Sequence, residues 1–207
     1  MTPTCQSLIT KHQSAWEAAT HHPFLDNCKS GTIKPAQFNT WLVQDYLFVV
    51  DFTRMAGRLL AAAPVAHFDV LLAGISALKD ELNWFRDKAG ERKLNLSTVM
   101  QDTCKRYCEF MEKLSLEPYA VQALAFWAIE LAYNQGWQLP GKMKKPYDEF
   151  AERWGNPGFT EYVNHLARQA DDVLQNARKE ILDRAEQVFL EVAAFEQQFW
   201  EMAFSGK

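Results

Sequence analysis

Hydrophobic residues recur at helical spacing along almost the whole chain, and this feature limits the possible folds more than any other. No segment alternates apolar and polar residues for long, and no Asn-Gly or Asp-Gly pair marks a hairpin. We therefore expect an all-α helical bundle that forms a single domain over residues 1–207. Prolines and glycines divide the pattern into expected helices at residues 4–19, 35–63, 67–88, 97–114, 118–136, 160–175 and 177–204. We also expect a shorter helix after Pro146, and a loop with one short turn at residues 21–35.

The charge pattern argues against nucleic acid and membrane as partners. The chain has 22 Lys and Arg residues against 26 Asp and Glu residues, without a basic run that could follow a phosphate backbone. No apolar run reaches the roughly 18 residues of a membrane span, and the N-terminal residues do not resemble a secretory signal. These observations predict a cytoplasmic protein. The cysteines lack the spacing of a zinc site and are expected to be reduced; they are Cys5, Cys28, Cys104 and Cys108.

One carboxylate stands within a strongly apolar helical segment, residues 122–137. Helical spacing places Glu130 on one stripe with Phe126, Tyr133 and Trp137. A buried carboxylate costs several kcal/mol unless it is paired, or else it holds a proton that it would lose in water. Glu130 is therefore expected to serve either a structural pairing or a chemical step.

The same pattern recurs at three other carboxylates. Asp45 falls between Trp41 and Phe48, and Glu196 falls on a stripe of large apolar residues. Glu81 lies on an apolar stripe of its own helix, as either a supporting residue of a site or an exposed residue. If these groups converge, they form a polar centre inside an aromatic bundle; pairing within each helix and edge positions are the competing interpretations.

Such a centre favours organic chemistry over metal chemistry. A di-iron bundle needs Glu-x-x-His, which the chain lacks, and its five histidines fall outside these aromatic stripes. No metal and no cofactor is therefore expected. Aromatic walls stack on flat heterocycles, carboxylates accept hydrogen bonds from ring nitrogens and amines, and a buried carboxyl group can act as general acid or base.

Four segments in order, "WLVQDYLFVVDF", "TCKRYCEFME", "RWGNPGFTEYV" and "FEQQFWEMAF", resemble the motifs of the TenA family, which has the haem-oxygenase-like helical fold. The resemblance runs from about residue 22 to residue 204. It implies hydrolysis of thiamin-derived aminopyrimidines, with Asp45 binding the pyrimidine and Glu196 acting as acid or base. Phe48 and Trp154 stand where a tyrosine is common. The expected substrate-binding residues are Asp45, Tyr107, Phe48 and Trp154, together with Tyr133 and Trp41 from the stripes above.

The helix that contains Glu130 departs from one branch of that family. That branch carries a nucleophilic cysteine in this helix, whereas the matching text here, "ALAFWAIELAY", has none and resembles a second branch that uses a glutamate. Cys104 and Cys108 belong to another helix and are not expected to replace it. The resemblance implies Glu130 as the catalytic base, water as the nucleophile, and little cleavage of thiamin.

The implied reaction releases formate or ammonia from formylaminomethyl-pyrimidine, aminomethyl-pyrimidine or both. The family likeness also implies a homodimer or homotetramer. Two alternatives stay open: a non-catalytic protein that binds a thiamin-derived pyrimidine, and a metal-dependent oxygenase on the same scaffold.

Overall fold

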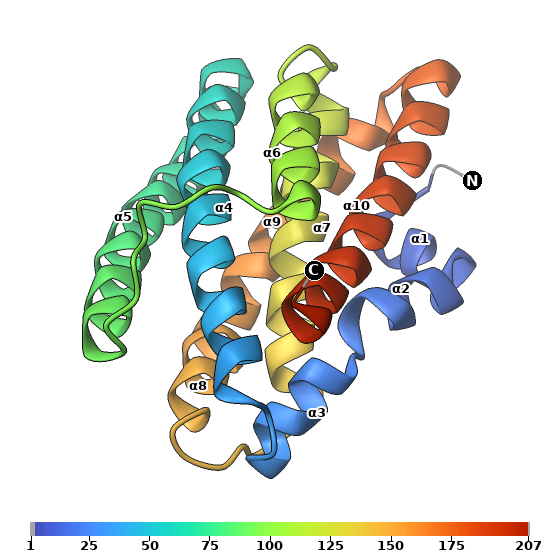
Figure 1. Cartoon of the computed structure of the whole chain (residues 1–207). Helices are drawn as coiled ribbons and strands as arrows, with labels where there is room; N and C mark the ends of the chain where they lie inside the picture. Colours follow the sequence, from blue (N-terminus) through green and yellow to red (C-terminus); the bar gives the residue numbers. More distant parts are fainter. Residues whose placement is uncertain (1–2, 207) are drawn as a thin grey trace. The chain divides into compact units, whose positions relative to one another are not determined.

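The structure, a computed structural model that describes residues 3–206, is built from α-helices, and no β-strand occurs in that range (Figure 1). The all-α fold expected from hydrophobic spacing is confirmed. Within the described range the elements are α1 (Cys5–Lys11), α2 (Gln13–Thr20), α3 (Pro23–Ser30), α4 (Pro35–Ala62), the short 3₁₀ helix η1 (Val65–His67), α5 (Phe68–Glu91), α6 (Asp102–Leu114), α7 (Tyr119–Gln138), α8 (Asp148–Gly155), α9 (Pro157–Gln175) and α10 (Lys179–Ser205).

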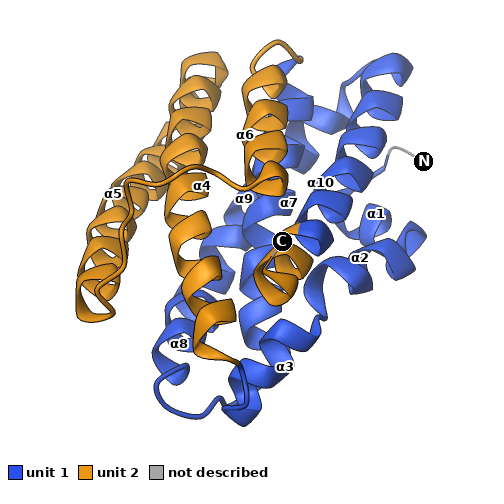
Figure 2. Cartoon of the chain, in the orientation of Figure 1, with its two compact units in different colours: residues 1–33, 118–198 blue, residues 34–117, 199–207 orange. Residues whose placement is uncertain are grey.

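The described residues divide into two compact units (Figure 2). Unit 1 is formed by residues 3–33 and 118–198, and unit 2 by residues 34–117 and 199–206. Helix α10 is continuous and belongs to both, since it passes from unit 1 to unit 2 after Gln198. The expectation of a single domain over residues 1–207 stays a prediction.

In unit 1, α7 packs against α9, α8 and α2. Most of its residues between Ala120 and Trp137 are buried, as expected for a helix that is apolar around its circumference. The ring of Trp16 in α2 packs against those of Trp127 and Phe189 at centroid distances of 6.4 and 5.1 Å, and these two rings also stack on each other at 6.2 Å. These rings form part of the core of unit 1.

In unit 2, α4 packs against α5 and α6. Pro35 occupies the first turn of α4, where its missing N–H would have no helical partner in any case, and the helix ends before Pro64. The helix predicted at residues 35–63 is thus confirmed. Gln37 donates a side-chain hydrogen bond to the carbonyl of Phe204, which joins the start of α4 to the end of α10 within unit 2.

The first predicted helix is wrong in one respect, because residues 4–19 form two helices that meet at His12. The backbone of His12 leaves the helical region, and its ring nitrogen Nε2 lies 2.8 Å from Glu186 Oε1. Lys11 contacts the same carboxylate at 2.6 Å. Tertiary contacts of this kind override a continuous helical pattern.

The region expected to be mainly loop contains the eight-residue helix α3. Both of its ends are capped. At the start, the ring of His22 accepts a hydrogen bond from the amide of Phe24, and Pro23 is the first residue of the helix. At the end, Gly31 adopts a left-handed conformation with φ of 71°. Only a residue without a side chain adopts that conformation at little cost. A short helix is marginal alone, so these caps and the burial of Phe24 stabilise it.

The predicted start of the fourth helix is also wrong, since α6 begins at Asp102 and not after Ser97. The amide of Ser97 instead donates to the side chain of Asn95 at 2.9 Å, which forms a local turn. Two further hydrogen bonds hold the loop ahead of α6, because Gln44 accepts from the amide of Gln101 at 2.8 Å and donates to the carbonyl of Val99 at 3.3 Å.

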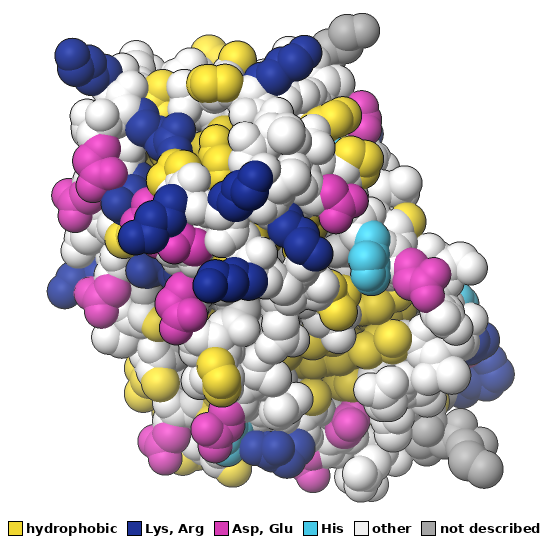
Figure 3. Space-filling model, turned by 90° about the horizontal axis from the view of Figure 1, so that it is seen from below, with side chains coloured by type: hydrophobic (Ala, Val, Ile, Leu, Met, Phe, Trp, Pro, Cys, Tyr) yellow, Lys and Arg dark blue, Asp and Glu magenta, His cyan; other side chains and the backbone are white. Residues whose placement is uncertain are grey.

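No helix in residues 3–206 combines the length and apolar character required to cross a bilayer. Figure 3 shows Lys and Arg side chains standing beside Asp and Glu side chains on the viewed face. This mixture follows from the nearly balanced charge of the chain, with a formal net charge of −4 at pH 7.

Candidate functional site

Glu130 lies in the second half of α7 and is 7% exposed. The residues one helical turn before and after it, Phe126 and Asn134, are 1% exposed. The predicted burial of this carboxylate is confirmed. Removing a carboxylate from water is costly unless polar groups meet it, so its surroundings decide what it can do.

Tyr162 of α9 supplies one polar group to Glu130. Its phenol oxygen donates to Glu130 Oε1 at 3.4 Å. This distance is longer than that of a strong hydrogen bond. The sequence did not single out Tyr162, because nothing in the chain pattern pairs residues 32 positions apart.

Two of the predicted substrate-binding residues of unit 1 contact each other. The rings of Tyr133 and Trp154 meet edge to face at a centroid distance of 5.7 Å. Trp154 also stacks on Trp137 at 5.6 Å and on Phe150 at 6.4 Å. This stack fixes the indole of Trp154, which is 2% exposed, against the last turns of α7.

Asn134 fixes the junction between α8 and α9 to α7. Its amide nitrogen donates to the carbonyl of Trp154 at 2.7 Å and to the hydroxyl of Thr160 at 3.1 Å. Gly155 lies close to α7 as well, since a Cβ placed there would be 3.2 Å from the backbone of Gln138. Sequence reasoning missed Asn134, although a polar residue one turn after Glu130 in an apolar helix was a usable signal.

Glu196, the second predicted catalytic residue, lies in the unit 1 part of α10 and is 1% exposed. Val192, one turn earlier, is fully buried. The placement of Glu196 on a buried apolar stripe is confirmed.

Unit 2 contains the other predicted residues. Asp45 is fully buried in α4, and Phe48, one turn later, packs against Tyr107 of α6 at a centroid distance of 4.9 Å. Phe48 also meets Phe199 edge to face at 5.6 Å. Trp41 packs against other core rings of this unit, and its contact with a ligand stays a prediction.

Gln44, the neighbour of Asp45, connects α4 to α6. Besides holding the loop before α6, it accepts a hydrogen bond from the Cys104 thiol through its backbone carbonyl at 3.4 Å. Because Tyr107 lies one turn after Cys104, these contacts set the position of Tyr107 relative to α4. Gln44 and Asp45 both stand in the segment "WLVQDYLFVVDF", but this role of Gln44 could not be predicted from the segment alone.

The cysteines of α6 are unsuited to nucleophilic attack. Cys104 and Cys108 are both buried. Contact with the Cys104 sulfur, burial and the nearby Asp51 carboxylate raise the pKa of the Cys108 thiol far above its usual range. A thiol with a raised pKa carries little thiolate at neutral pH, and the thiolate is the nucleophilic form.

Two further predictions concern Glu81 and metals. Glu81 is half-buried in α5 of unit 2, and its role stays open. Within residues 3–206 no group of three or more His, Cys, Asp or Glu side chains is arranged to hold a metal ion.

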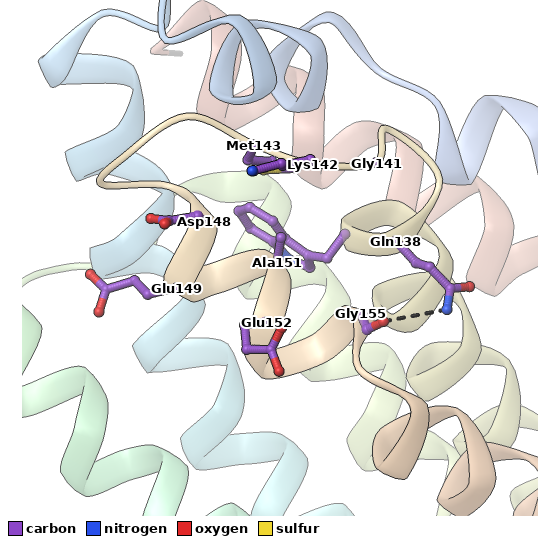
Figure 4. A pocket seen from close by; sticks show the side chains of 10 residues that line it. Gln138, Gly141, Lys142, Met143, Asp148, Glu149, Ala151, Glu152 and Gly155 are labelled. Carbon is purple, nitrogen blue, oxygen red and sulfur yellow. Dashed lines mark hydrogen bonds between the residues drawn. The ribbon is translucent and has the colours of Figure 1, made fainter.

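A pocket of about 560 Å³ opens in unit 1 between the end of α7 and α8 (Figure 4). Carboxylates border it, and Gln138 donates to the carbonyl of Gly155 at 3.3 Å across one edge. None of the predicted site residues lines this pocket. Its lining comprises Trp137, Gln138, Gly141, Lys142, Met143, Asp148, Glu149, Ala151, Glu152 and Gly155.

The sequence and the fold of this chain are similar to those of known proteins. The model of the TENA/THI-4/PQQC family matches residues 9–206. The chain belongs to this family. A TenA homologue of known structure from Pyrococcus furiosus superposes with a TM-score of 0.92 at 28% identity, covering 96% of this chain and 98% of that one. The TenA helical bundle predicted for the chain is therefore confirmed.

Similar proteins align with this TenA-family chain over nearly its full length. A probable bifunctional TENA-E protein from Glycine max is 35% identical, over 96% of this chain and 92% of its own length. An aminopyrimidine aminohydrolase from Halalkalibacterium halodurans is 24% identical over 97% and 95%, and one from Helicobacter pylori is 22% identical over 97% and 98%.

Proposed function

We propose that this TenA-family protein hydrolyses formylaminomethyl-pyrimidine, aminomethyl-pyrimidine or both, in the salvage of thiamin breakdown products, with Glu130 as the base. The observation that carries the proposal is a buried carboxylate in a helix without a cysteine. The similarity to a TENA-E protein and to aminopyrimidine aminohydrolases supports the same class of reaction.

In the proposed complex, Asp45 accepts hydrogen bonds from the pyrimidine amine and a protonated ring nitrogen. The aromatic side chains that the family resemblance implies, Phe48, Tyr107 and Trp154, supply the flat walls together with Tyr133. Their burial supports this role, because a dry aromatic surface favours stacking of a heterocycle. The meeting of the carboxylates at positions 45, 130 and 196 around one ligand is part of the proposal.

The proposed deformylation uses two carboxyl groups in different roles. Glu130 removes a proton from water as the water oxygen bonds to the formyl carbon, and the C–N bond then breaks. Glu196 gives a proton to the departing amine, and formate is released. For the amine substrate, the water oxygen bonds to the methylene carbon while the protonated nitrogen leaves as ammonia. A general base and a general acid each contribute about 100-fold or more to such reactions.

The test is an assay of the purified protein against thiamin, the formyl compound and the amine, with formate, ammonia and thiazole measured separately. We expect release of formate or ammonia and little release of thiazole. Thiamin cleavage as rapid as pyrimidine hydrolysis would contradict the proposal that Glu130 acts as a base in place of a cysteine nucleophile. Tight pyrimidine binding without release of any product would instead identify a binding protein.

Glu130→Gln should lower kcat by about 100-fold or more, because the amide cannot accept the proton from water. The pyrimidine dissociation constant should change by less than about fivefold, since the change retains the shape of the side chain. Glu161→Gln is a matched control, because Glu161 is exposed on α9 and lies 4.0 Å from His165 in a surface pair. Equal turnover by the Glu130 and Glu161 variants would show that Glu130 is not the catalytic base.

A further inference from the structure

The contact between Tyr162 and Glu130 occurs where two helices of unit 1 are fixed against each other. Tyr162 Oη donates to Glu130 Oε1 at 3.4 Å, from α9 to α7. Helices α7 and α9 pack against each other. A phenol donor held by packed helices is placed more accurately than one on a loop.

Hydrogen bonds beside this contact set the register of the two helices. Asn134, one turn after Glu130, donates to the hydroxyl of Thr160, two residues before Tyr162. The same hydroxyl lies 3.2 Å from the amide oxygen of Asn134. Asn134 is 1% exposed, so water does not compete for these bonds.

The first turn of α9 is also capped and packed. Asn156 accepts a hydrogen bond from the amide of Phe159 at 2.9 Å, which satisfies one of the free donors at the start of the helix. The ring of Phe159 packs against that of Tyr162 at a centroid distance of 5.9 Å. The cap and the ring contact restrict the directions in which the Tyr162 phenol can point.

We infer that Tyr162 is a positioning residue for Glu130, whose phenol holds the carboxylate in the orientation that water activation requires. This inference rests on the proposed function. A carboxylate that accepts one directed hydrogen bond loses its rotational freedom, and correct orientation of a base contributes to the rate without contributing to substrate affinity. Tyr162 acts through Glu130 and does not itself exchange a proton with the substrate.

The kinetic test compares Tyr162→Phe, Glu130→Gln and the double variant. Tyr162→Phe keeps the ring and removes the donor, so kcat should fall by about tenfold while KM stays within about twofold. The double variant should retain the same residual activity as Glu130→Gln alone, because a positioning residue has no effect once its target is gone. A rise in KM with unchanged kcat would overturn the inference by showing that Tyr162 binds substrate directly.

A second test does not depend on activity. Midpoints of urea unfolding for the unsubstituted protein and these three variants form a double-mutant cycle, and the shifts of the two single variants should not add. Tyr119→Phe is the control, because it also removes a phenol hydroxyl but at the start of α7, far from Glu130 along the helix. Its shift should add to that of Glu130→Gln. Additive shifts for Tyr162 would overturn the inference. If the unfolding shifts do not add but the protein hydrolyses none of the pyrimidines, the contact between Tyr162 and Glu130 is supported and the proposed function is rejected.

Discussion

At the scale of single residues, two buried thiols of this protein are unreactive, whereas the buried Glu130 carboxylate accepts a hydrogen bond from a neighbouring helix. Burial and the Asp171 carboxylate raise the pKa of Cys5, and contact with Cys104 together with burial raises that of Cys108. Both thiols are therefore held in the protonated, unreactive form. Glu130, in contrast, has a hydrogen-bond donor within reach, the phenol of Tyr162.

Cys108→Ala should leave pyrimidine hydrolysis unchanged and lower the free energy of unfolding by about 1 kcal/mol, since a small buried side chain is shortened. The native protein should react slowly with a thiol reagent at pH 7.5, because a thiol whose pKa is raised stays protonated until the pH is well above the usual range. Addition of urea should then expose all four cysteines to the reagent. Rapid reaction of the native protein, with loss of turnover, would contradict this assignment.

Residue spacing alone was sufficient to predict that Asp45, Glu130 and Glu196 are buried, because helical periodicity determines which side of a helix faces the core. It could not predict Tyr162 or Asn134 as partners. Their contacts depend on which helices pack together and in what register, and that information is absent from the periodicity of any one segment.

At the scale of elements, the junction of α8 and α9 is held closely against α7. Asn134 binds the carbonyl of Trp154, and Gly155 approaches the backbone of α7 closely. Trp154 is thereby held at two places, through its backbone carbonyl by Asn134 and through its indole ring by the aromatic stack. A change in the packing of this junction should move Trp154 and, through α9, Tyr162.

Gly155→Ala should lower the free energy of unfolding by about 1–3 kcal/mol, because the added Cβ would lie 3.2 Å from backbone atoms of Gln138 that cannot shift cheaply. Gly57→Ala is the matched control in α4, where a Cβ meets nothing within 4 Å. That substitution should stabilise the protein by about 0.5–1 kcal/mol through helix propensity. Urea unfolding measures both, and a stabilised Gly155 variant would disprove the close approach.

Long helices were predictable at this scale because many residues contribute to one signal, which is a helical period in α4 and a long apolar segment without Pro in α7. The short helix α3 and the break at His12 were not, since each depends on caps or on a contact with another helix. The start of α6 was misplaced for a related reason: Gln44, far away in the chain, holds the loop that a local N-cap rule assigned to the helix.

At the scale of the whole molecule, α10 is the element shared by the two units. Its last turns supply Phe199 to the ring cluster of Phe48 in unit 2, and the carbonyl of Phe204 accepts from Gln37. The preceding turns belong to unit 1 and carry Glu196. The all-α architecture followed from the sequence, whereas the division of one helix between two units is a property of the tertiary contacts.

Phe199→Ala should lower the free energy of unfolding by about 3 kcal/mol or more, because it empties space beside Phe48. Since α10 is one continuous helix, we expect amide protons of α7 and of α4 to lose hydrogen-exchange protection together. Mass spectrometry of peptides from each unit measures this, and Ser205→Ala, at an exposed position of α10, is the control. Loss of protection confined to α4 would show that the units unfold separately.

The burial of all four cysteines has a practical consequence for spectroscopy. A cysteine introduced at the exposed Lys79 of α5 and another at the exposed Arg168 of α9 would offer accessible sites for fluorescent dyes without prior removal of the native thiols. A donor and acceptor attached there, one in each unit, would report by energy transfer how far apart the units lie and whether a pyrimidine changes that separation.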